Sequence, residues 1–245
     1  MKNSGASHLR KILERAREEV PSRLRVYVFD LDSTLFDVEP RMMAILKAFS
    51  QEPVWISKHS VACKKLSELK QLPRTFHFEK ILNELGLQNE SQEFRADILD
   101  FWRTRFFCND WLHLDSPYPG AQEYLQKLGQ LGAPVIYLTG RFEGTMLEGT
   151  IESLKHWNFP VAEPQFQLAL KPVESLDDAE FKQVYLRELA KTWPNITLFE
   201  NEPANIFLAK KDNPEIEFVF IDTVHAGTHE VEEGVLWIDN FLLQD

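Results

Sequence analysis

The chain has 245 residues, of which 44% are apolar and 27% charged, and 27 Lys and Arg against 38 Asp and Glu give a formal net charge of −11. This composition excludes a disordered, collagen-like or disulfide-built protein. The length allows one large domain or a domain with a substantial insertion. The acidic balance argues against a nucleic-acid groove, which needs clustered Lys and Arg, but not against a small anionic substrate.

The first twenty residues carry scattered charges and no apolar run, so a secretory signal is not expected. Apolar residues recur at helical spacing between Leu9 and Ala16 and predict a short amphipathic helix. No stretch approaches the ~20 apolar residues of a membrane span. The two cysteines, Cys63 and Cys108, fit no metal spacing, so we expect free thiols in a reducing cytosol and a cytoplasmic protein.

Short apolar runs rich in Val, Ile, Phe and Tyr predict strands that are buried on both faces. These runs are Leu24–Phe29, Pro134–Leu138, Phe166–Leu170, Ile196–Phe199 and Phe218–Ile221. Helical stretches precede or separate the last four, at about Gly120–Leu131, Gly144–Trp157, Asp178–Lys191 and Pro203–Lys211. The alternation predicts an α/β fold, a doubly wound parallel sheet with helices on both faces.

The segment between the first two strands breaks this alternation. It is predicted to be mostly helical, at Pro40–Phe49, Val61–Lys70, Phe78–Leu85 and Gln92–Phe107. Its large aromatic residues include Trp55, Phe101, Trp102, Phe106, Phe107 and Trp111. We expect these side chains to fill the core of a small helical bundle. The alternative is that some of them face a ligand cleft between the insertion and the sheet.

Two acidic residues, Asp30 and Asp32, directly follow the first predicted strand. In open parallel sheets, ligands bind just beyond the carboxyl ends of the strands. Two like charges there are costly unless a cation or a shared proton compensates. The pair therefore suggests a metal site, or a nucleophile beside an acid/base group, and the alternative is two ordinary loop residues.

A longer pattern surrounds this pair. The apolar strand followed by Asp30, Asp32 and Thr34 resembles the first motif of the haloacid dehalogenase (HAD) superfamily, Asp-x-Asp-x-Thr. The second predicted strand ends in Thr139-Gly140, which is similar to the second motif of that superfamily, a strand-terminal Thr followed by Gly. The motifs occur in the order that the superfamily shows.

The third and fourth motifs of the superfamily also have counterparts. Glu200-Asn201 after the fourth strand resembles the acidic strand end of the fourth motif. Two lysines are candidates for the third motif: Lys171 at the end of the third strand and Lys182 on the next helix. Lys182 is favoured because it lies 18 residues before Glu200, closer to the usual spacing than the 29 residues of Lys171. The lysine that is not used is expected to be a solvated surface residue.

The resemblance covers about residues 24–222 and implies a fold. That fold is a Rossmann-like core with strand order 3-2-1-4-5 and an α-helical cap of the C1 type inserted after the first strand. The expected division is a core of residues 1–37 and 116–245 and a cap of residues 38–115. This strand order would place the first and fourth motifs side by side.

The resemblance also implies phosphoryl transfer through an aspartyl-phosphate. Asp30 would attack the phosphorus, and Asp32 would protonate the leaving oxygen and then activate water. An acid at the second position favours a phosphatase or phosphomutase over a dehalogenase, because a departing halide needs no proton. Thr139 and Gly140 would bind phosphate oxygens, and Arg141 would either reach the substrate or pair with an acid on the surface.

A Mg²⁺ cofactor is implied as well. Its ligands would be Asp30, the backbone carbonyl of Asp32, and the side chain of Glu200 or Asn201. Asn201 stands where the superfamily commonly has a second Asp, so metal affinity or choice could differ.

Three further residues near the predicted sheet edge have metal-ligand chemistry. Asp222 follows the fifth predicted strand and is expected to be a loop residue. His225 and His229 are four residues apart, but a turn is predicted between them, which disfavours a metal pair.

The function expected from these motifs is a Mg²⁺-dependent phosphatase that acts on a small phosphorylated metabolite, without a membrane partner. One alternative is a phosphomutase with the same chemistry, which would interconvert sugar phosphates without net phosphate release. Another is a catalytically weak phosphate-ester-binding protein, suggested by Asn201. A third is a nucleic-acid end-processing phosphatase, suggested by the position of Lys182 and disfavoured by the charge of −11. The sequence indicates neither the substrate nor the oligomeric state.

Overall fold

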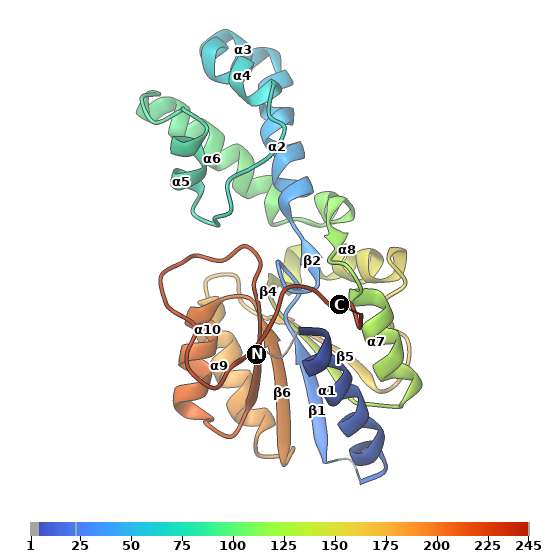
Figure 1. Ribbon diagram of the computed structural model, residues 1–245. Helices are drawn as coiled ribbons and strands as arrows, with labels where there is room; N and C mark the ends of the chain where they lie inside the picture. Colours follow the sequence, from blue (N-terminus) through green and yellow to red (C-terminus); the bar gives the residue numbers. More distant parts are fainter. Residues whose placement is uncertain (1–4, 23, 245) are drawn as a thin grey trace.

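A six-stranded parallel sheet organises the computed structural model, which describes residues 5–22 and 24–244 (Figure 1). Its strands are β1 (Arg25–Phe29), β4 (Val135–Phe142), β5 (Phe166–Lys171), β6 (Asn195–Glu200), β7 (Glu217–Ile221) and β8 (Leu236–Ile238). Their spatial order is β5-β4-β1-β6-β7-β8. The five predicted strands therefore have the order 3-2-1-4-5, and β1 lies between β4 and β6 as expected.

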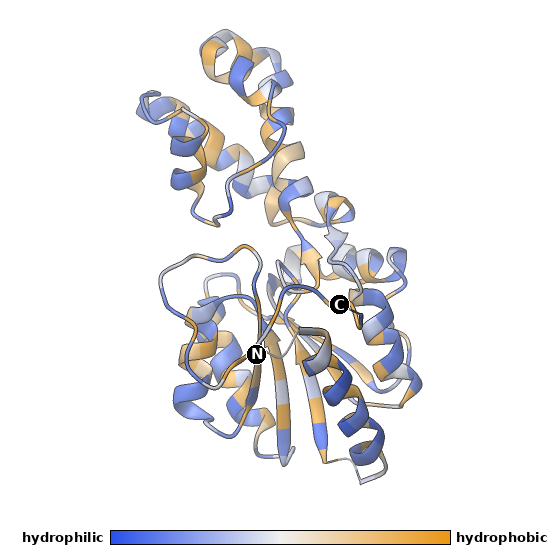
Figure 2. Cartoon of the chain, in the orientation of Figure 1, coloured by the Kyte–Doolittle hydropathy of each residue, from blue (hydrophilic) through white to orange (hydrophobic). Residues whose placement is uncertain are grey.

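Helices cover both faces of this sheet. One face carries α1 (Gly5–Glu19), α7 (Ala121–Gln130) and α8 (Glu143–His156), and the other carries α9 (Asp178–Leu189) and α10 (Pro203–Asp212). The alternation of side chains along β1 divides the core accordingly. Tyr27 and Phe29 pack towards α1 and α7, while Val26 and Val28 pack towards α9 and α10. The strands are the most apolar elements of this region in Figure 2.

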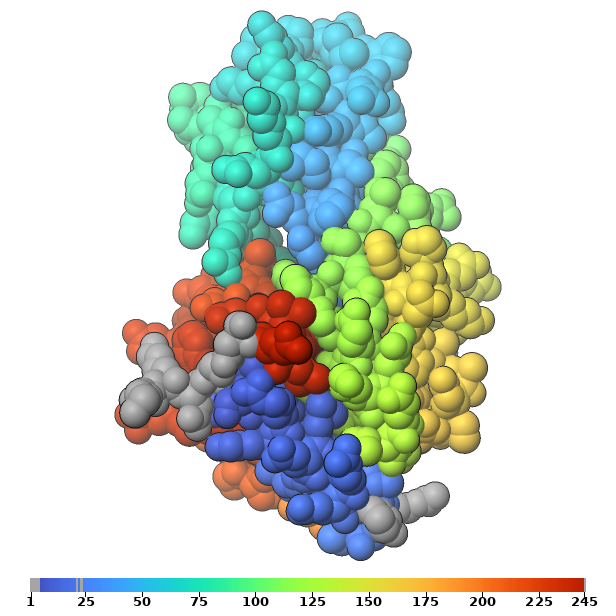
Figure 3. Space-filling view, turned by 45° about the vertical axis from the view of Figure 1, so that its right-hand side comes forward, coloured from blue at the N-terminus to red at the C-terminus, as the bar shows by residue number. Residues whose placement is uncertain are grey.

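The helical insertion is a separate block with its own apolar core. It contains α2 (Glu39–Gln51), α3 (Pro53–Lys58), α4 (Ser60–Ser67), α5 (Phe78–Glu84) and α6 (Gln92–Phe106), followed by the 3-10 helix η2 (Asn109–Leu114). Its core includes Phe49, Phe94 and Phe101. Figure 3 shows this block standing above the sheet.

The chain passes between the sheet and the helical block through one short antiparallel pair. β2 (Phe36–Asp37) pairs with β3 (Ser116–Pro117). These crossing points coincide with the ends of the predicted insertion. None of the helices in the described ranges combines the length and the apolar character needed to traverse a lipid bilayer.

Some elements differ from the sequence prediction. β4 continues to Phe142 instead of ending at Leu138, because Phe142 pairs with Lys171 beyond an irregularity after Thr139. The short helix α3 and the edge strand β8 were not predicted. The helix predicted between Leu9 and Ala16 is confirmed, and it buries Leu9, Ile12 and Ala16.

Candidate active site

Strand β1 delivers Asp30 and Asp32 to the carboxyl edge of the sheet through a tight loop. The carbonyl of Leu31 accepts hydrogen bonds from the backbone N–H groups of Thr34, Leu35 and Phe36. Ser33 has a φ of 59°, the left-handed conformation that such a turn requires. The backbone N–H of Asp30 donates to the carbonyl of Phe199 at 3.1 Å, so the start of the loop is tied to β6.

Asp30 belongs to a buried group that we call the lysine cluster: Asp30, Thr34, Lys182 and Glu200. Lys182 Nζ donates to Asp30 Oδ1 at 2.6 Å and to Glu200 Oε2 at 2.8 Å. The hydroxyl of Thr34 lies 3.0 Å from Asp30 Oδ2. All four side chains are buried, so the ion pairs are shielded from water.

Burial and ion pairing together set the pKa values of Asp30 and Lys182 in this cluster. Burial raises the pKa of Asp30 to about 7, partly opposed by Lys182 and reinforced by the charges of Glu200 and Asp32. Burial alone would lower the pKa of Lys182, but Asp30 and Glu200 outweigh it and raise that pKa. Lys182 is therefore a permanent cation at neutral pH.

The structure separates the two lysines that were candidates for the third motif. Lys182 lies between Asp30 and Glu200, whereas Lys171 donates to Asp178 at 2.6 Å. Lys171 is buried, so the prediction that the other lysine is a solvated surface residue was wrong. Lys171 ends β5, and the acid that pairs with it lies in the first turn of α9.

Asn201 approaches Asp30 from the end of β6. Its Oδ1 lies 3.1 Å from the Thr34 hydroxyl, and its Nδ2 donates to the carbonyl of Val224 at 2.6 Å. A hydroxyl has one proton, so Thr34 can donate to Asp30 or to Asn201 but not to both. At any moment, therefore, the Thr34 hydroxyl leaves one of these two oxygens without a hydrogen bond from it. Two such oxygens are suitable ligands for a hard cation.

Glu200 has less freedom than the sequence prediction assumed. Its Oε1 accepts the backbone N–H groups of Asn201 and Glu202 at 3.1 and 3.0 Å, and its Oε2 accepts Lys182. Both oxygens are thus already engaged. Across residues 5–22 and 24–244, no three His, Cys, Asp or Glu side chains form a ready metal-binding group.

Asp32 lies in a second group, the arginine cluster: Asp32, Arg41, Asp115 and Arg141. The side chain of Asp32 is 28% exposed, and the other three are buried. Asp32 Oδ1 accepts from Arg141 Nη2 at 2.6 Å and from Arg41 Nη2 at 3.1 Å, and its Oδ2 accepts from Arg141 Nε at 3.2 Å. Although burial opposes ionisation, Arg141 and Arg41 lower the pKa of Asp32 to about 2. Asp32 is therefore ionised at neutral pH.

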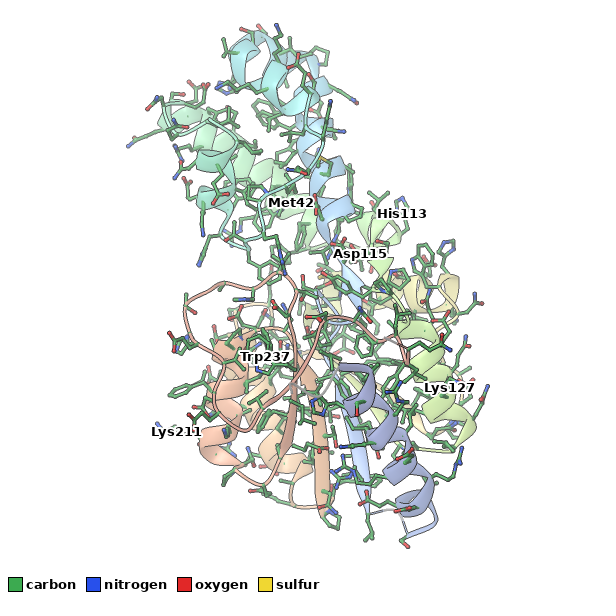
Figure 4. The ribbon with its side chains drawn as sticks, viewed as in Figure 1. Met42, His113, Asp115, Lys127, Lys211 and Trp237 are labelled. Carbon is green, nitrogen blue, oxygen red and sulfur yellow. The ribbon has the colours of Figure 1, made fainter. Side chains whose placement is uncertain are left out.

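Asp115 completes the arginine cluster. Its Oδ2 accepts from Arg141 Nη2 at 2.9 Å, and its Oδ1 forms an ion pair with Arg41 Nε at the same distance. Burial raises the pKa of Asp115 to about 6 in spite of both arginines. Figure 4 labels Asp115 at the junction between the helical block and the sheet.

Sequence analysis missed Arg41 and Asp115, because no motif contains them. Arg41 is fully buried, stacks on the Phe106 ring at 3.9 Å and donates to the Phe106 carbonyl at 2.9 Å. For Arg141, the two expectations were a substrate contact or pairing with a surface acid. It pairs with two acids, of which Asp115 is fully buried and Asp32 is partly exposed.

A cavity of about 360 Å³ lies over both clusters, between the sheet edge and the helical block. Eight of the predicted site residues line it: Asp30, Asp32, Thr139, Gly140, Arg141, Lys182, Glu200 and Asn201. Lys171 lies outside this lining. The volume is within the ~300–1,000 Å³ of small-molecule sites.

Thr139 and Gly140 line the cavity from β4. The Thr139 oxygen accepts the backbone N–H of Arg141 at 3.3 Å, which leaves its own O–H free to donate. A Cβ atom at Gly140 would lie 2.4 Å from Asp178 Oδ2, so a larger residue here would displace the Asp178 side chain.

The remaining candidates lie outside this cavity. Asp222 forms an ion pair with Arg74 of the helical block at 3.7 Å. His225 Nδ1 accepts the N–H of Gly227 at 3.1 Å, and His229 Nδ1 lies 3.1 Å from the Thr228 hydroxyl.

The sheet order and the carboxylates at the strand ends together define a doubly wound α/β core with a helical insertion. A family model described as haloacid dehalogenase-like hydrolase matches residues 24–199. The chain belongs to this family and is a hydrolase of the haloacid dehalogenase type. Among curated protein sequences, none matches the chain.

Several solved structures share the fold. A haloacid dehalogenase-like family hydrolase from Streptococcus pneumoniae has a TM-score of 0.53 at 13% identity, with 89% of this chain and 94% of that chain covered. A predicted phosphatase from Clostridium acetobutylicum gives 0.52 at 16% identity, with coverages of 88% and 93%. A predicted phosphoglycolate phosphatase from Haemophilus somnus gives 0.50 at 15% identity, with coverages of 89% and 95%.

Proposed function

We propose that this hydrolase is a Mg²⁺-dependent phosphatase that acts on a small phosphomonoester through an aspartyl-phosphate. The observation that carries the proposal is the placement of Asp30. Its carboxylate lines the cavity, held by Lys182 at 2.6 Å and facing the Thr34 hydroxyl at 3.0 Å. Family membership and the phosphatase names of two similar proteins support the same conclusion.

The residues present suit a magnesium ion. Asp30 and Asn201 supply two oxygen atoms that converge on one Thr34 proton, and the backbone carbonyl of Asp32 is the third donor that the family resemblance implies. Glu200 would act indirectly, since its oxygens hold Lys182 and two backbone N–H groups. When bound, the ion would neutralise phosphate charge and favour the ionised form of Asp30.

Five of the residues that line the cavity then have a role. Asp30 attacks the phosphorus, and the P–O bond to the alcohol breaks. The Thr139 hydroxyl, the Gly140 N–H and the Lys182 ammonium bind phosphoryl oxygens. Asp32 accepts a proton from the water that hydrolyses the aspartyl-phosphate.

Protonation of the leaving oxygen by Asp32 is opposed by its two arginine partners. A carboxyl group with a pKa of about 2 holds its proton too weakly at neutral pH. Protonation of the leaving oxygen and acceptance of a proton from water therefore both require at least one arginine contact to be lost when substrate binds. Within the proposal, residues 38–115 form the cap over a core of residues 1–37 and 116–245.

The test is phosphate release from a panel of phosphomonoesters with Mg²⁺, for the wild type and for Asp30→Asn. We expect the substitution to lower turnover by at least ~10³-fold, because an amide cannot replace the nucleophile. Asp222→Asn is the matched control, since Asp222 follows β7 at the same edge but does not line the cavity. Wild-type turnover in Asp30→Asn, with an unchanged unfolding transition, would contradict the proposal.

A further inference from the structure

The cavity over Asp30 has two unlike walls. The sheet edge contributes mostly charged and polar groups, whereas the six lining residues from the helical block are all apolar: Val38, Met42, Phe76, Trp102, Phe106 and Phe107. Met42 lies on α2 at the end nearer the sheet (Figure 4). A phosphoryl group bound at Asp30 therefore leaves the alcohol part of the ester against the apolar wall.

Three rings of this wall form a continuous aromatic surface. The ring centroid of Trp102 lies 5.1 Å from that of Phe106 and 5.5 Å from that of Phe107, and Phe106 and Phe107 are 5.1 Å apart. Phe107 is 45% exposed, so its ring is not consumed by the core of the helical block. Of the three rings, Phe107 therefore has the most surface left for a flat apolar group, against which an aromatic ring packs favourably.

The charges that line the cavity disfavour a second anionic group on the substrate. Five acids line it against two bases: Asp30, Asp32, Asp178, Glu200 and Glu202 against Arg141 and Lys182. Both bases already form ion pairs, Arg141 with Asp32 and Asp115, and Lys182 with Asp30 and Glu200. Among the described lining residues, no unpaired cation is left for a carboxylate or a second phosphate.

The side chains of this wall offer the hydroxyl groups of a sugar no N–H or O–H donor except the buried indole of Trp102. Hydroxyl groups that lose water against aromatic rings without gaining a hydrogen bond are destabilised. An apolar group in the same place gains from leaving water. The apolar wall and the paired charges of the cavity thus both favour an apolar, uncharged alcohol.

We propose that the substrate is the phosphate monoester of a flat, apolar, uncharged alcohol, of which an aromatic alcohol is the simplest example. This inference rests on the proposed phosphatase function. In the net reaction, water adds across the P–O bond of the ester. The alcohol leaves with a proton on its oxygen, and inorganic phosphate carries the oxygen that came from water.

The experiment compares kcat/KM with Mg²⁺ for benzyl phosphate, ethyl phosphate and phosphoglycolate. All three have an alkyl leaving oxygen, so the comparison reports the pocket more than intrinsic reactivity. We expect benzyl phosphate to exceed ethyl phosphate by about 30-fold or more, a ratio that apolar pockets reach, and phosphoglycolate to be the poorest substrate. If kcat/KM for ethyl phosphate or phosphoglycolate equals or exceeds that for benzyl phosphate, this inference alone is overturned. If no phosphate is released from any of the three esters, the proposed function is overturned as well.

A pair of variants locates the preference. Phe107→Ala should lower the ratio of benzyl to ethyl phosphate about tenfold, because it removes an aromatic ring from the cavity wall. The matched control is Phe207→Ala: Phe207 is 39% exposed on α10 and does not line the cavity. An unchanged ratio in Phe107→Ala, or equal losses in both variants, would overturn the assignment of this wall to the substrate.

Discussion

The lysine cluster and the arginine cluster are built around Asp30 and Asp32, which are only two residues apart in the chain. The pKa values of these two carboxyl groups are nevertheless shifted in opposite directions. Burial raises the pKa of Asp30 to about 7, because the one lysine that it shares with Glu200 offsets only part of that effect. Asp32 is held by two arginines, and its pKa falls to about 2. The contrast shows that the roles of paired acids depend on the groups that other elements bring to them.

The largest effect should follow from removing the cation of the lysine cluster. Lys182→Met leaves Asp30 and Glu200 facing each other without a counter-charge, and we expect a loss of about 3–5 kcal/mol of stability. Turnover should fall by at least ~10³-fold, measured beside urea unfolding. Lys171→Met is the matched control, and equal damage in both variants would remove the distinction between the two lysines.

The pH dependence of stability should have opposite signs at the two carboxylates. Without metal, Asp30 has a folded pKa of about 7 against an unfolded value of ~4, so its stabilising contribution is complete below pH ~4 and is lost as the pH rises through 7. Asp32 has a folded pKa of about 2, so its contribution is complete above pH ~4 and is lost as the pH falls towards 2.

Urea unfolding of metal-free Asp30→Asn and Asp32→Asn tests this contrast. Asp30→Asn should flatten the decline in stability between pH 4 and 7, and Asp32→Asn should flatten the decline below pH 4. Parallel pH profiles for the two variants would show that the two clusters do not differ as described.

A smaller loss is expected from Arg41→Met, because Asp32 and Asp115 both keep Arg141. We expect about 2 kcal/mol of destabilisation and a higher pKa for Asp32. Arg105→Met is the control: Arg105 also stacks on a ring of the helical block, Phe101, but is partly exposed. An exposed pair contributes about 0–1 kcal/mol, so similar losses in both variants would argue against the arginine cluster.

The smallest effect concerns the metal. Asn201→Asp adds a negative charge beside Asp30 and should lower the Mg²⁺ concentration for half-maximal activity by about tenfold, equivalent to ~1.4 kcal/mol. Magnesium titration of phosphate release provides the measurement. A higher half-maximal concentration in Asn201→Asp would indicate that Asn201 does not bind the metal.

The buried strands were predictable because each is an almost continuous apolar run, whereas their order was implied only by the resemblance to the haloacid dehalogenase superfamily. β8 was not predictable, since it has only three residues and the side chain of Trp237 is 49% exposed. Sequence analysis predicted helices for most of the insertion. It did not predict α3, a helix of six residues that buries none of its side chains.

The residues of the candidate site were likewise predictable only in part. Lys182 was favoured through its spacing to Glu200, and the structure places it between Asp30 and Glu200. The arginine cluster was not predicted, because its members come from distant positions and meet only through tertiary packing. A buried arginine such as Arg41 looks in the sequence like any surface arginine on a helix.

The two arginines that bind Asp32 lie on opposite sides of the short β2–β3 connection. Arg41 belongs to the helical block, whereas Arg141 belongs to the sheet. A rotation of the block about the β2–β3 pair would therefore move Arg41 relative to Asp32, while the contact of Arg141 with Asp32 would stay within the sheet region. The number of arginines that contact Asp32 would thus depend on the distance between the helical block and the sheet.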